Sequence, residues 1–167
     1  AWLSRHSLYF ECFFRHQLLA DLMRVLLLSE SPQRVTILSA EVDSEGYDLV
    51  LSCGASTRYV QFKVLGKGTT SVKYTIKASL ADLPGACVLW LCYDKATLRT
   101  THYHLLAGEP GAPLGSLLPT SIAQRKKNGE VAERQGYVHV RIKDANHPYL
   151  RIDELAVALF GPRDAEQ

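Results

Sequence analysis

Residues 47–65 read YDLVLSCGASTRYVQFKVL, and this stretch decides the fold. Apolar and β-branched side chains dominate residues 47–52 and 58–65, a composition typical of β-strands. The Gly-containing segment 53–57 between them is short enough to be a turn. The sequence therefore predicts an antiparallel hairpin at this place in the chain.

Three polar side chains stand on the predicted hairpin. Asp48 opens the first strand, and Gln61 and Lys63 lie two residues apart on the second. Because side chains alternate between the two faces of a strand, Gln61 and Lys63 share one face, and cross-strand pairing can bring Asp48 beside them. A carboxylate and an amide carbonyl are oxygen ligands of the kind that Mg²⁺ prefers. The hairpin is therefore a candidate metal site with a lysine next to it.

An amphipathic helix is predicted before the hairpin, over residues 4–28. Its apolar residues recur at spacings of three and four, which is typical of a helix with one buried face. These residues are Leu8, Cys12, Leu18, Leu19, Leu22, Val25 and Leu26. A short β-branched strand is predicted next, over residues 35–38.

A second helix is predicted after the hairpin, over residues 71–83. Val72, Ile76 and Leu80 recur there at a spacing of four residues. The Pro-Gly pair at 84–85 would end this helix, because proline cannot continue it.

The rest of the chain continues with strands and a last helix. Residues 86–93 form an apolar run short enough to be a central strand, and residues 100–106 alternate as its neighbour. The polar residues 124–134 are compatible with a helix or a loose segment. Residues 137–142 alternate as a strand, and residues 153–160 have the pattern of a short helix. This order predicts an α/β fold with a mixed central sheet flanked by helices.

Two runs carry a resemblance to a known family. EGYDLVL (residues 45–51) and YVQFKV (residues 59–64) resemble the PD-(D/E)XK nuclease superfamily, in particular its Mrr-like and Holliday-junction-resolvase-like branches. In that family an acidic residue opens a hairpin, and an acid-x-Lys motif follows on the next strand. The resemblance implies one restriction-endonuclease-like domain over residues 1–167, with an αβββαβ core and a C-terminal strand and helix.

The resemblance also implies a reaction and its site residues. The reaction would be Mg²⁺- or Mn²⁺-dependent hydrolysis of phosphodiester bonds by an endonuclease, with DNA favoured over RNA. Asp48, Gln61 and Glu11 of the first helix would hold the ion. The backbone carbonyl of Phe62 would be a further ligand. Lys63 would orient the attacking water or stabilise the phosphate.

The chain departs from the family pattern at two positions. Tyr47 stands where the family name has Pro, and Gln61 stands where an acid is usual, although Mrr-like members are similar in carrying Gln there. A neutral amide holds Mg²⁺ more weakly than a carboxylate. One alternative is therefore a catalytically inactive nuclease-fold domain that binds nucleic acid or a protein partner. Another is an unrelated α/β structural or regulatory protein whose polar hairpin residues lie on the surface.

Each site residue also has an ordinary structural explanation. Asp48 could be a turn carboxylate at a strand start, and Gln61 and Lys63 could belong to a solvated strand face. Glu11 could pair with Arg15 on the exposed face of its helix, a contact of about 0.3–0.5 kcal/mol. Three further acids precede the hairpin and compete for the role of metal ligand: Glu41, Asp43 and Glu45.

Basic and histidine side chains give weaker signals. Lys67, Lys73 and Lys77, with the basic cluster 125–127, could bind phosphates or be simply solvated. His102 and His104 alternate on one predicted strand. No third ligand accompanies them at a suitable sequence spacing, so packed strand histidines are favoured over a metal pair.

Composition bounds the remaining classes. The formal net charge of +2 does not by itself indicate a polyanion partner. Charged residues interrupt the first helix, and no signal peptide is visible, so we expect a cytoplasmic protein without a membrane partner. A homodimer would suit cleavage of both strands of a duplex. The four cysteines form no C-x-x-C pair, which favours buried free thiols over a zinc site or a disulfide; they are Cys12, Cys53, Cys87 and Cys92.

Overall fold

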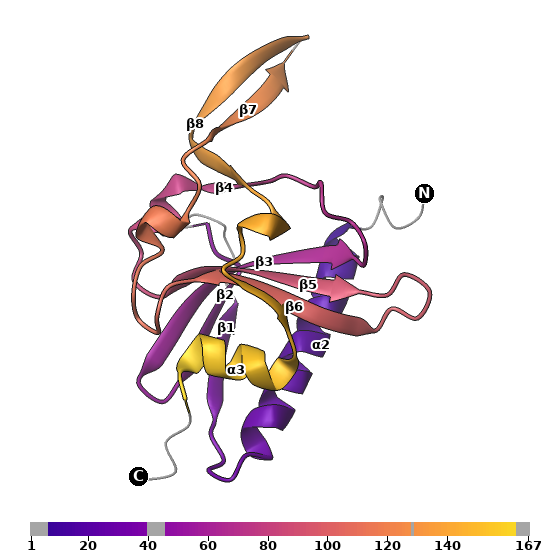
Figure 1. Cartoon of the computed structure of the whole chain (residues 1–167), viewed down its shortest axis with the longest axis vertical. Helices are drawn as coiled ribbons and strands as arrows, with labels where there is room; N and C mark the ends of the chain where they lie inside the picture. The colour runs from indigo at the N-terminus through magenta and orange to yellow at the C-terminus, as the bar shows by residue number, and fades with distance from the viewer. Residues whose placement is uncertain (1–6, 40–45, 128, 163–167) are drawn as a thin grey trace.

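A six-stranded mixed sheet forms the centre of the fold, in the order β1-β2-β3-β5-β6-β9 (Figure 1). The structure is a computed structural model, and it describes residues 7–39, 46–127 and 129–162. Strands β3 and β5 are parallel, and every other neighbouring pair in this sheet is antiparallel. The strands are β1 (Val35–Ser39), β2 (Leu49–Cys53), β3 (Ser56–Gly66), β5 (Ala86–Tyr93), β6 (Thr100–Ala107) and β9 (His147–Leu150).

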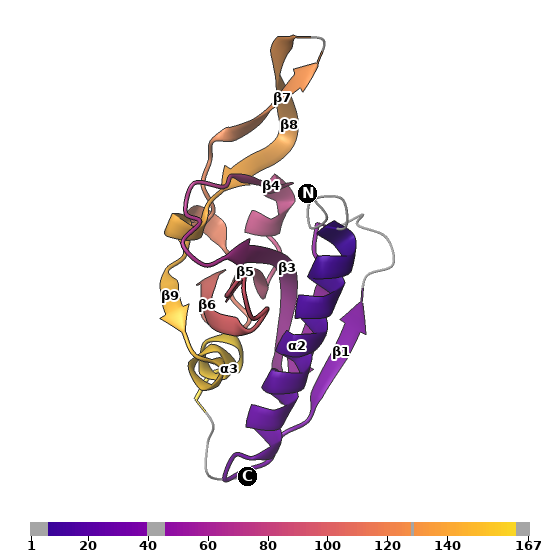
Figure 2. The ribbon, with the colours of Figure 1, turned by 90° about the vertical axis from the view of Figure 1, so that its right-hand side faces the viewer.

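Two α-helices pack on one face of this sheet, α2 (Ser7–Leu27) and α3 (Ile152–Phe160) (Figure 2). The buried residues of α2 are Phe14, Leu18, Leu22 and Leu26, which follow one another at intervals of four residues. This spacing places them on one side of the helix, against β2, β3 and β5. None of the helices in the described residues combines the length and apolar character that a bilayer crossing requires.

A smaller sheet and three short 3₁₀ helices cover the other face. The sheet has the order β4-β8-β7, and its strands are β4 (Tyr74–Lys77), β7 (Ile122–Lys127) and β8 (Glu130–Val140). The 3₁₀ helices are η1 (Ala78–Ala81), η2 (Gly115–Leu117) and η3 (Ile142–Asp144). A second buried cluster around Trp90 lies between these elements and the central sheet. The outer part of the β7–β8 hairpin projects away from the body of the molecule (Figure 1).

The predicted fold class is confirmed: the chain folds into a mixed central sheet with helices packed on it. The predicted 47–65 hairpin is present as β2 and β3, and the apolar run 86–93 is the central strand β5. The first and last predicted helices are α2 and α3.

The predicted helix over residues 71–83 is wrong. The segment forms strand β4 followed by the 3₁₀ helix η1, so the second α-helix of the predicted αβββαβ core is replaced by a strand and a short 3₁₀ helix. Ile76 and Leu80 are buried, but Ile76 lies opposite Val138 of β8 in a strand pair. The β-branched Thr75 and Ile76 favour a strand. Ile76 lies in β4 and Leu80 in η1, so their spacing of four residues spans two elements and does not mark one helix face.

The helix or loose segment considered for residues 124–134 is also wrong, because these residues form the β7–β8 hairpin. Most of their side chains are exposed. A strand without a buried face does not need apolar residues at alternate positions, so its sequence lacks the pattern that predicts a strand. The Asn-Gly pair at 128–129 is a known hairpin signal, and Gly129 has the positive φ of 86° that such turns require.

A fully buried arginine ties the central sheet to α3. The Arg58 guanidinium on β3 donates hydrogen bonds to the carbonyl oxygens of Leu159 (2.7 Å), Ala158 (3.1 Å) and Gly108 (3.0 Å). Ala158 and Leu159 belong to the last turn of α3, where carbonyl groups lack helical partners. Burial lowers the pKa of Arg58, yet the cation is well placed at the negative end of the helix dipole.

Candidate active site

Asp48 lies immediately before β2, where the pairing of β2 with β3 ends. Its backbone N–H donates to the carbonyl oxygen of Val60 at 2.8 Å. Its carboxylate Oδ2 accepts hydrogen bonds from the backbone N–H of Phe62 at 2.7 Å and from Gln61 Nε2 at 2.5 Å. The carboxylate therefore extends the hydrogen bonding between β2 and β3 by one residue, and these bonds hold it beside the centre of β3.

Gln61 and Lys63 project from the same face of β3, next to Asp48. Gln61 is only 5% exposed, so the solvated-face explanation is wrong for this residue. Lys63 is half-buried, and its Nζ lies 5.9 Å from the centre of the Tyr74 ring. A buried amide bonded to a carboxylate, with an ammonium group nearby, forms a polar site within an otherwise apolar sheet.

Glu11 reaches the same site from α2. It precedes Phe14 by three residues and Leu18 by seven, so it lies on the sheet-facing side of the helix and is half-buried. Burial raises the pKa of Glu11, Asp48 raises it further, and Lys63 and Arg15 lower it. No ion pair between Glu11 and Arg15 lies within 4.0 Å, although both residues are described. The four residues predicted from the sequence thus come together.

Neutralising Glu11 is expected to stabilise the metal-free protein. A carboxyl whose pKa is raised by folding contributes stability that is lost as the pH rises through the raised pKa. We expect Glu11→Gln to raise the melting temperature in EDTA at neutral pH, and to leave it nearly unchanged below the ordinary pKa of 4.5. Glu30→Gln, at an exposed glutamate beyond the same helix, is the control. A lower melting temperature for Glu11→Gln at pH 7 would mean that Lys63 and Arg15 outweigh burial.

Tyr74 borders the site and was not predicted. Its hydroxyl donates to the Val64 carbonyl at 3.2 Å, and its ring lies beside the Lys63 ammonium group. Burial, with smaller contributions from Cys92 and Glu11, raises the pKa of Tyr74 to about 12. The hydroxyl is therefore a proton donor at neutral pH. Nothing in the sequence marks this residue, because it comes from β4 beyond a loop.

The three predicted phosphate-binding lysines separate in the structure. Lys67 and Lys73 are exposed and line two different pockets, and Lys143 lines both of them. Lys77 is half-buried, and its aliphatic stem packs against Gly46. Lys67, Lys73 and Lys143 therefore form one basic surface, whereas Lys77 lines neither pocket, and its phosphate-binding role stays a prediction.

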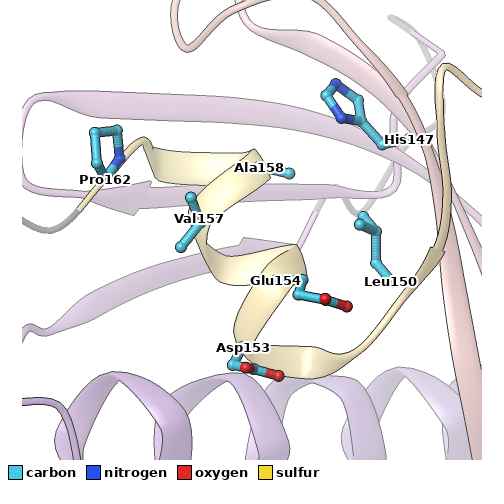
Figure 3. A pocket seen from close by; sticks show the side chains of 7 residues that line it. All are labelled: His147, Leu150, Asp153, Glu154, Val157, Ala158 and Pro162. Atoms are coloured by element: carbon cyan, nitrogen blue, oxygen red, sulfur yellow. The ribbon is translucent and has the colours of Figure 1, made fainter.

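A larger pocket lies elsewhere, between β9 and α3 (Figure 3). Its volume is about 670 Å³, and its lining is mainly apolar with Asp153 and Glu154 at one side. Asp153 accepts a bond from the exposed Arg151, so its charge is already paired at the surface. None of the predicted site residues lines this pocket. The competing acids Glu41, Asp43 and Glu45 lie outside the described residues.

The chain was compared with protein-family models, curated proteins and solved structures. No protein-family model matches the chain, and no curated protein matches it. Among solved structures, the chain is similar to Hjc, a Holliday junction resolvase from the hyperthermophilic archaeon Archaeoglobus fulgidus. The sequences are 11% identical, the match covers 90% of this chain and 98% of that chain, and the TM-score is 0.46.

Proposed function

We propose that this chain is a nuclease that hydrolyses phosphodiester bonds in DNA with the help of Mg²⁺ or Mn²⁺. Glu11, Asp48, Gln61 and Lys63 would form its catalytic site. The observation that supports this most strongly is the contact of Asp48 with both the buried Gln61 amide and the Phe62 N–H. It sets a carboxylate, an amide and a lysine at the end of one strand pair, with a second carboxyl group from α2 beside them.

The donor atoms fit a hard divalent cation. Carboxylate, amide and backbone carbonyl oxygens are the ligands that Mg²⁺ accepts, with water in the remaining positions. The N–H and C=O of one strand residue point to the same side, so the Phe62 carbonyl leaves β3 on the side where its N–H meets Asp48. Glu11 and Asp48 repel each other, and a divalent cation between them would relieve this repulsion. Glu11, Asp48, Gln61 and the Phe62 carbonyl would therefore hold it.

The remaining groups have separate tasks in the proposed reaction. The bound ion would lower the pKa of a coordinated water and neutralise charge that grows on the phosphate. Lys63 would orient the attacking water, or donate to a phosphate oxygen as negative charge develops there. Tyr74 keeps the Lys63 ammonium group within reach through its ring, at 5.9 Å from the ring centre.

The basic surface would hold the nucleic-acid backbone. Lysine contacts to phosphates position a duplex without reading its sequence, and Lys67, Lys73 and Lys143 would make contacts of this kind. Arg125 and Lys126 on the exposed β7–β8 hairpin add two further cations. Such contacts to phosphates would make the affinity for DNA fall as the salt concentration rises.

The test is a cleavage assay of the purified chain on several nucleic acids. Supercoiled plasmid, linear duplex, a four-way junction, single-stranded DNA and RNA are each incubated with Mg²⁺, Mn²⁺ or EDTA. We expect cleavage of at least one DNA form with either metal ion and none in EDTA. The pattern across the substrates would assign the preferred DNA structure.

The same assay separates the inactive alternative. Salt-sensitive DNA binding without cleavage of any substrate would contradict the nuclease proposal and favour an inactive nuclease-fold domain that binds nucleic acid. Sedimentation of the active protein would test the predicted homodimer, since two sites related by a twofold axis suit the two strands of a duplex. The single domain and the cytoplasmic location predicted from the sequence stay predictions.

A further inference from the structure

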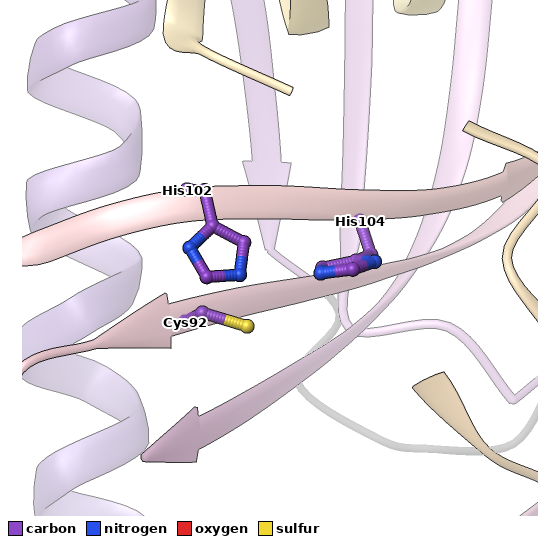
Figure 4. Close-up of side chains that lie close together, drawn as sticks. All are labelled: Cys92, His102 and His104. Carbon is purple, nitrogen blue, oxygen red and sulfur yellow. The ribbon is translucent and has the colours of Figure 1, made fainter. Parts of the chain in front are cut away.

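A cysteine and two histidines converge on the sheet face away from the α-helices. On β6, His102 and His104 lie two residues apart and therefore share a face. In the antiparallel pair of β5 with β6, Cys92 lies directly opposite His102, and Trp90 lies opposite His104. The Cys92 thiol and one ring nitrogen of each histidine all lie within 4.8 Å of one another. Figure 4 shows the thiol and the two rings directed into the same space.

These three side chains are a ligand set for a borderline-soft metal ion. Thiolate sulfur and imidazole nitrogen are the preferred ligands of Zn²⁺, with Zn–S near 2.3 Å and Zn–N about 2.0–2.1 Å. Tetrahedral bonds of these lengths separate the ligand atoms by about 3.3–3.7 Å, so small rotations of the side chains would bring the set to bonding distance. Mg²⁺ prefers oxygen ligands, so this set differs in kind from the donors around Asp48.

The hydrogen bonding of the two rings leaves nitrogen atoms available. His102 Nδ1 contacts the Thr101 hydroxyl at 2.9 Å, which orients the ring and leaves its Nε2 for another partner. His104 is 6% exposed, and its Nδ1 is buried without a hydrogen-bond partner.

Ring stacking is the competing explanation for this cluster. Tyr149 packs against both histidines, with its ring centre 5.1 Å from that of His102 and 4.7 Å from that of His104. Stacking accounts for the ring positions, but it uses neither the Cys92 thiol nor the unpaired Nδ1 of His104. Tyr149 also has a positive φ of 57°, which bulky residues rarely adopt, so its backbone is held in a costly conformation at this place.

We propose that Cys92, His102 and His104 bind one Zn²⁺ ion, with a water or an anion as the fourth ligand. All three line a pocket of about 460 Å³ that also contains Lys67 and Lys143. Binding would release the Cys92 thiol proton to solvent, leaving a thiolate on the metal. The positive charge of Lys67 would repel a metal ion bound by His102. The negative charges of the Cys92 thiolate and of an anionic fourth ligand would offset this repulsion.

Titration of the metal-free chain with Co²⁺ alone tests the proposal, because Co²⁺ reports a bound thiolate by a charge-transfer band. We expect one equivalent of Co²⁺ to produce a thiolate-to-cobalt band and tetrahedral visible bands, and one equivalent of Zn²⁺ to remove these bands. Cys92→Ser and His102→Gln are expected to abolish the charge-transfer band and the tetrahedral bands, respectively. His102 is only half-buried, so its variant provides a test if the buried Cys92 variant does not fold.

Four control variants make the result specific to this cluster. Cys12 and His16 on α2 form another thiol–imidazole contact at 3.6 Å, so Cys12→Ser must leave the band intact. His139→Gln controls for a histidine on β8, and Tyr149→Ala removes the stacking without removing a ligand. Asp48→Asn must also leave the band, since it alters only the proposed nuclease site. Absence of the band in the folded wild-type chain, or its persistence in folded Cys92→Ser, would overturn the proposal.

Discussion

Asp48→Asn is expected to abolish metal-dependent cleavage while the protein stays folded. Asparagine has the shape of aspartate, and its amide oxygen can still accept the hydrogen bond from the Phe62 N–H. The substitution removes the negative charge that would hold the cation. We expect the single-turnover cleavage rate to fall about a hundred-fold or more, equivalent to ~3 kcal/mol of lost transition-state stabilisation. Asp48→Ala would also lose the backbone contact and cost about 1–3 kcal/mol of folding stability.

Matched variants separate this effect from a general loss of charge. Asp82→Asn changes an exposed carboxylate beyond η1 and should leave the rate unchanged. Lys63→Ala should reduce the rate as strongly as Asp48→Asn. Gln61→Glu should retain cleavage and lower the Mg²⁺ concentration that is required, because a carboxylate binds Mg²⁺ more tightly than an amide. An Asp48→Asn protein that melts normally and cleaves at the wild-type rate would remove Asp48 from the catalytic site.

The sequence predicts the fold correctly where the local pattern of apolar residues matches the side chains that the structure buries. The apolar run 86–93 became the central strand β5 because both of its faces are covered, one by α2 and α3 and the other by the second cluster. The positions of Asp48 and Gln61 followed from the hairpin, whose short turn fixes its register. Contacts within this one hairpin are local, so the sequence contains the information to place them.

The failures have a common physical origin in contacts between distant segments. Residues 71–83 have an apolar spacing that suits a helix, but β4 pairs with β8, whose residues lie 60 to 66 positions further along the chain, and this pairing stabilises the strand. Cys92 and His102 are ten residues apart, and their meeting depends on the bulge-containing register of β5 with β6. A search for metal ligands by sequence spacing therefore finds two histidines and no third ligand.

Arg58 is the clearest case of a residue whose importance the sequence does not reveal. In the sequence it is one cation at the start of a predicted strand, where an exposed side chain is the usual outcome. In the structure it is completely buried and bonds to Gly108 and to the last turn of α3, about 100 residues away. The β3 strand that carries the proposed catalytic residues is thereby joined to the C-terminal helix.

Arg58→Leu is expected to destabilise the protein by about 3 kcal/mol, because three carbonyl oxygens would lose their donor in a buried place. Urea unfolding followed by circular dichroism would measure the loss. Ser56→Ala provides a graded comparison: Ser56 donates one bond to the Phe160 carbonyl at 3.2 Å, so about 1 kcal/mol is expected. Arg34→Leu, at an exposed arginine, should change stability little. A loss below 1 kcal/mol for Arg58→Leu would mean that removing the buried charge offsets the lost bonds, since Arg58 has a lowered pKa and therefore a desolvation cost of its own.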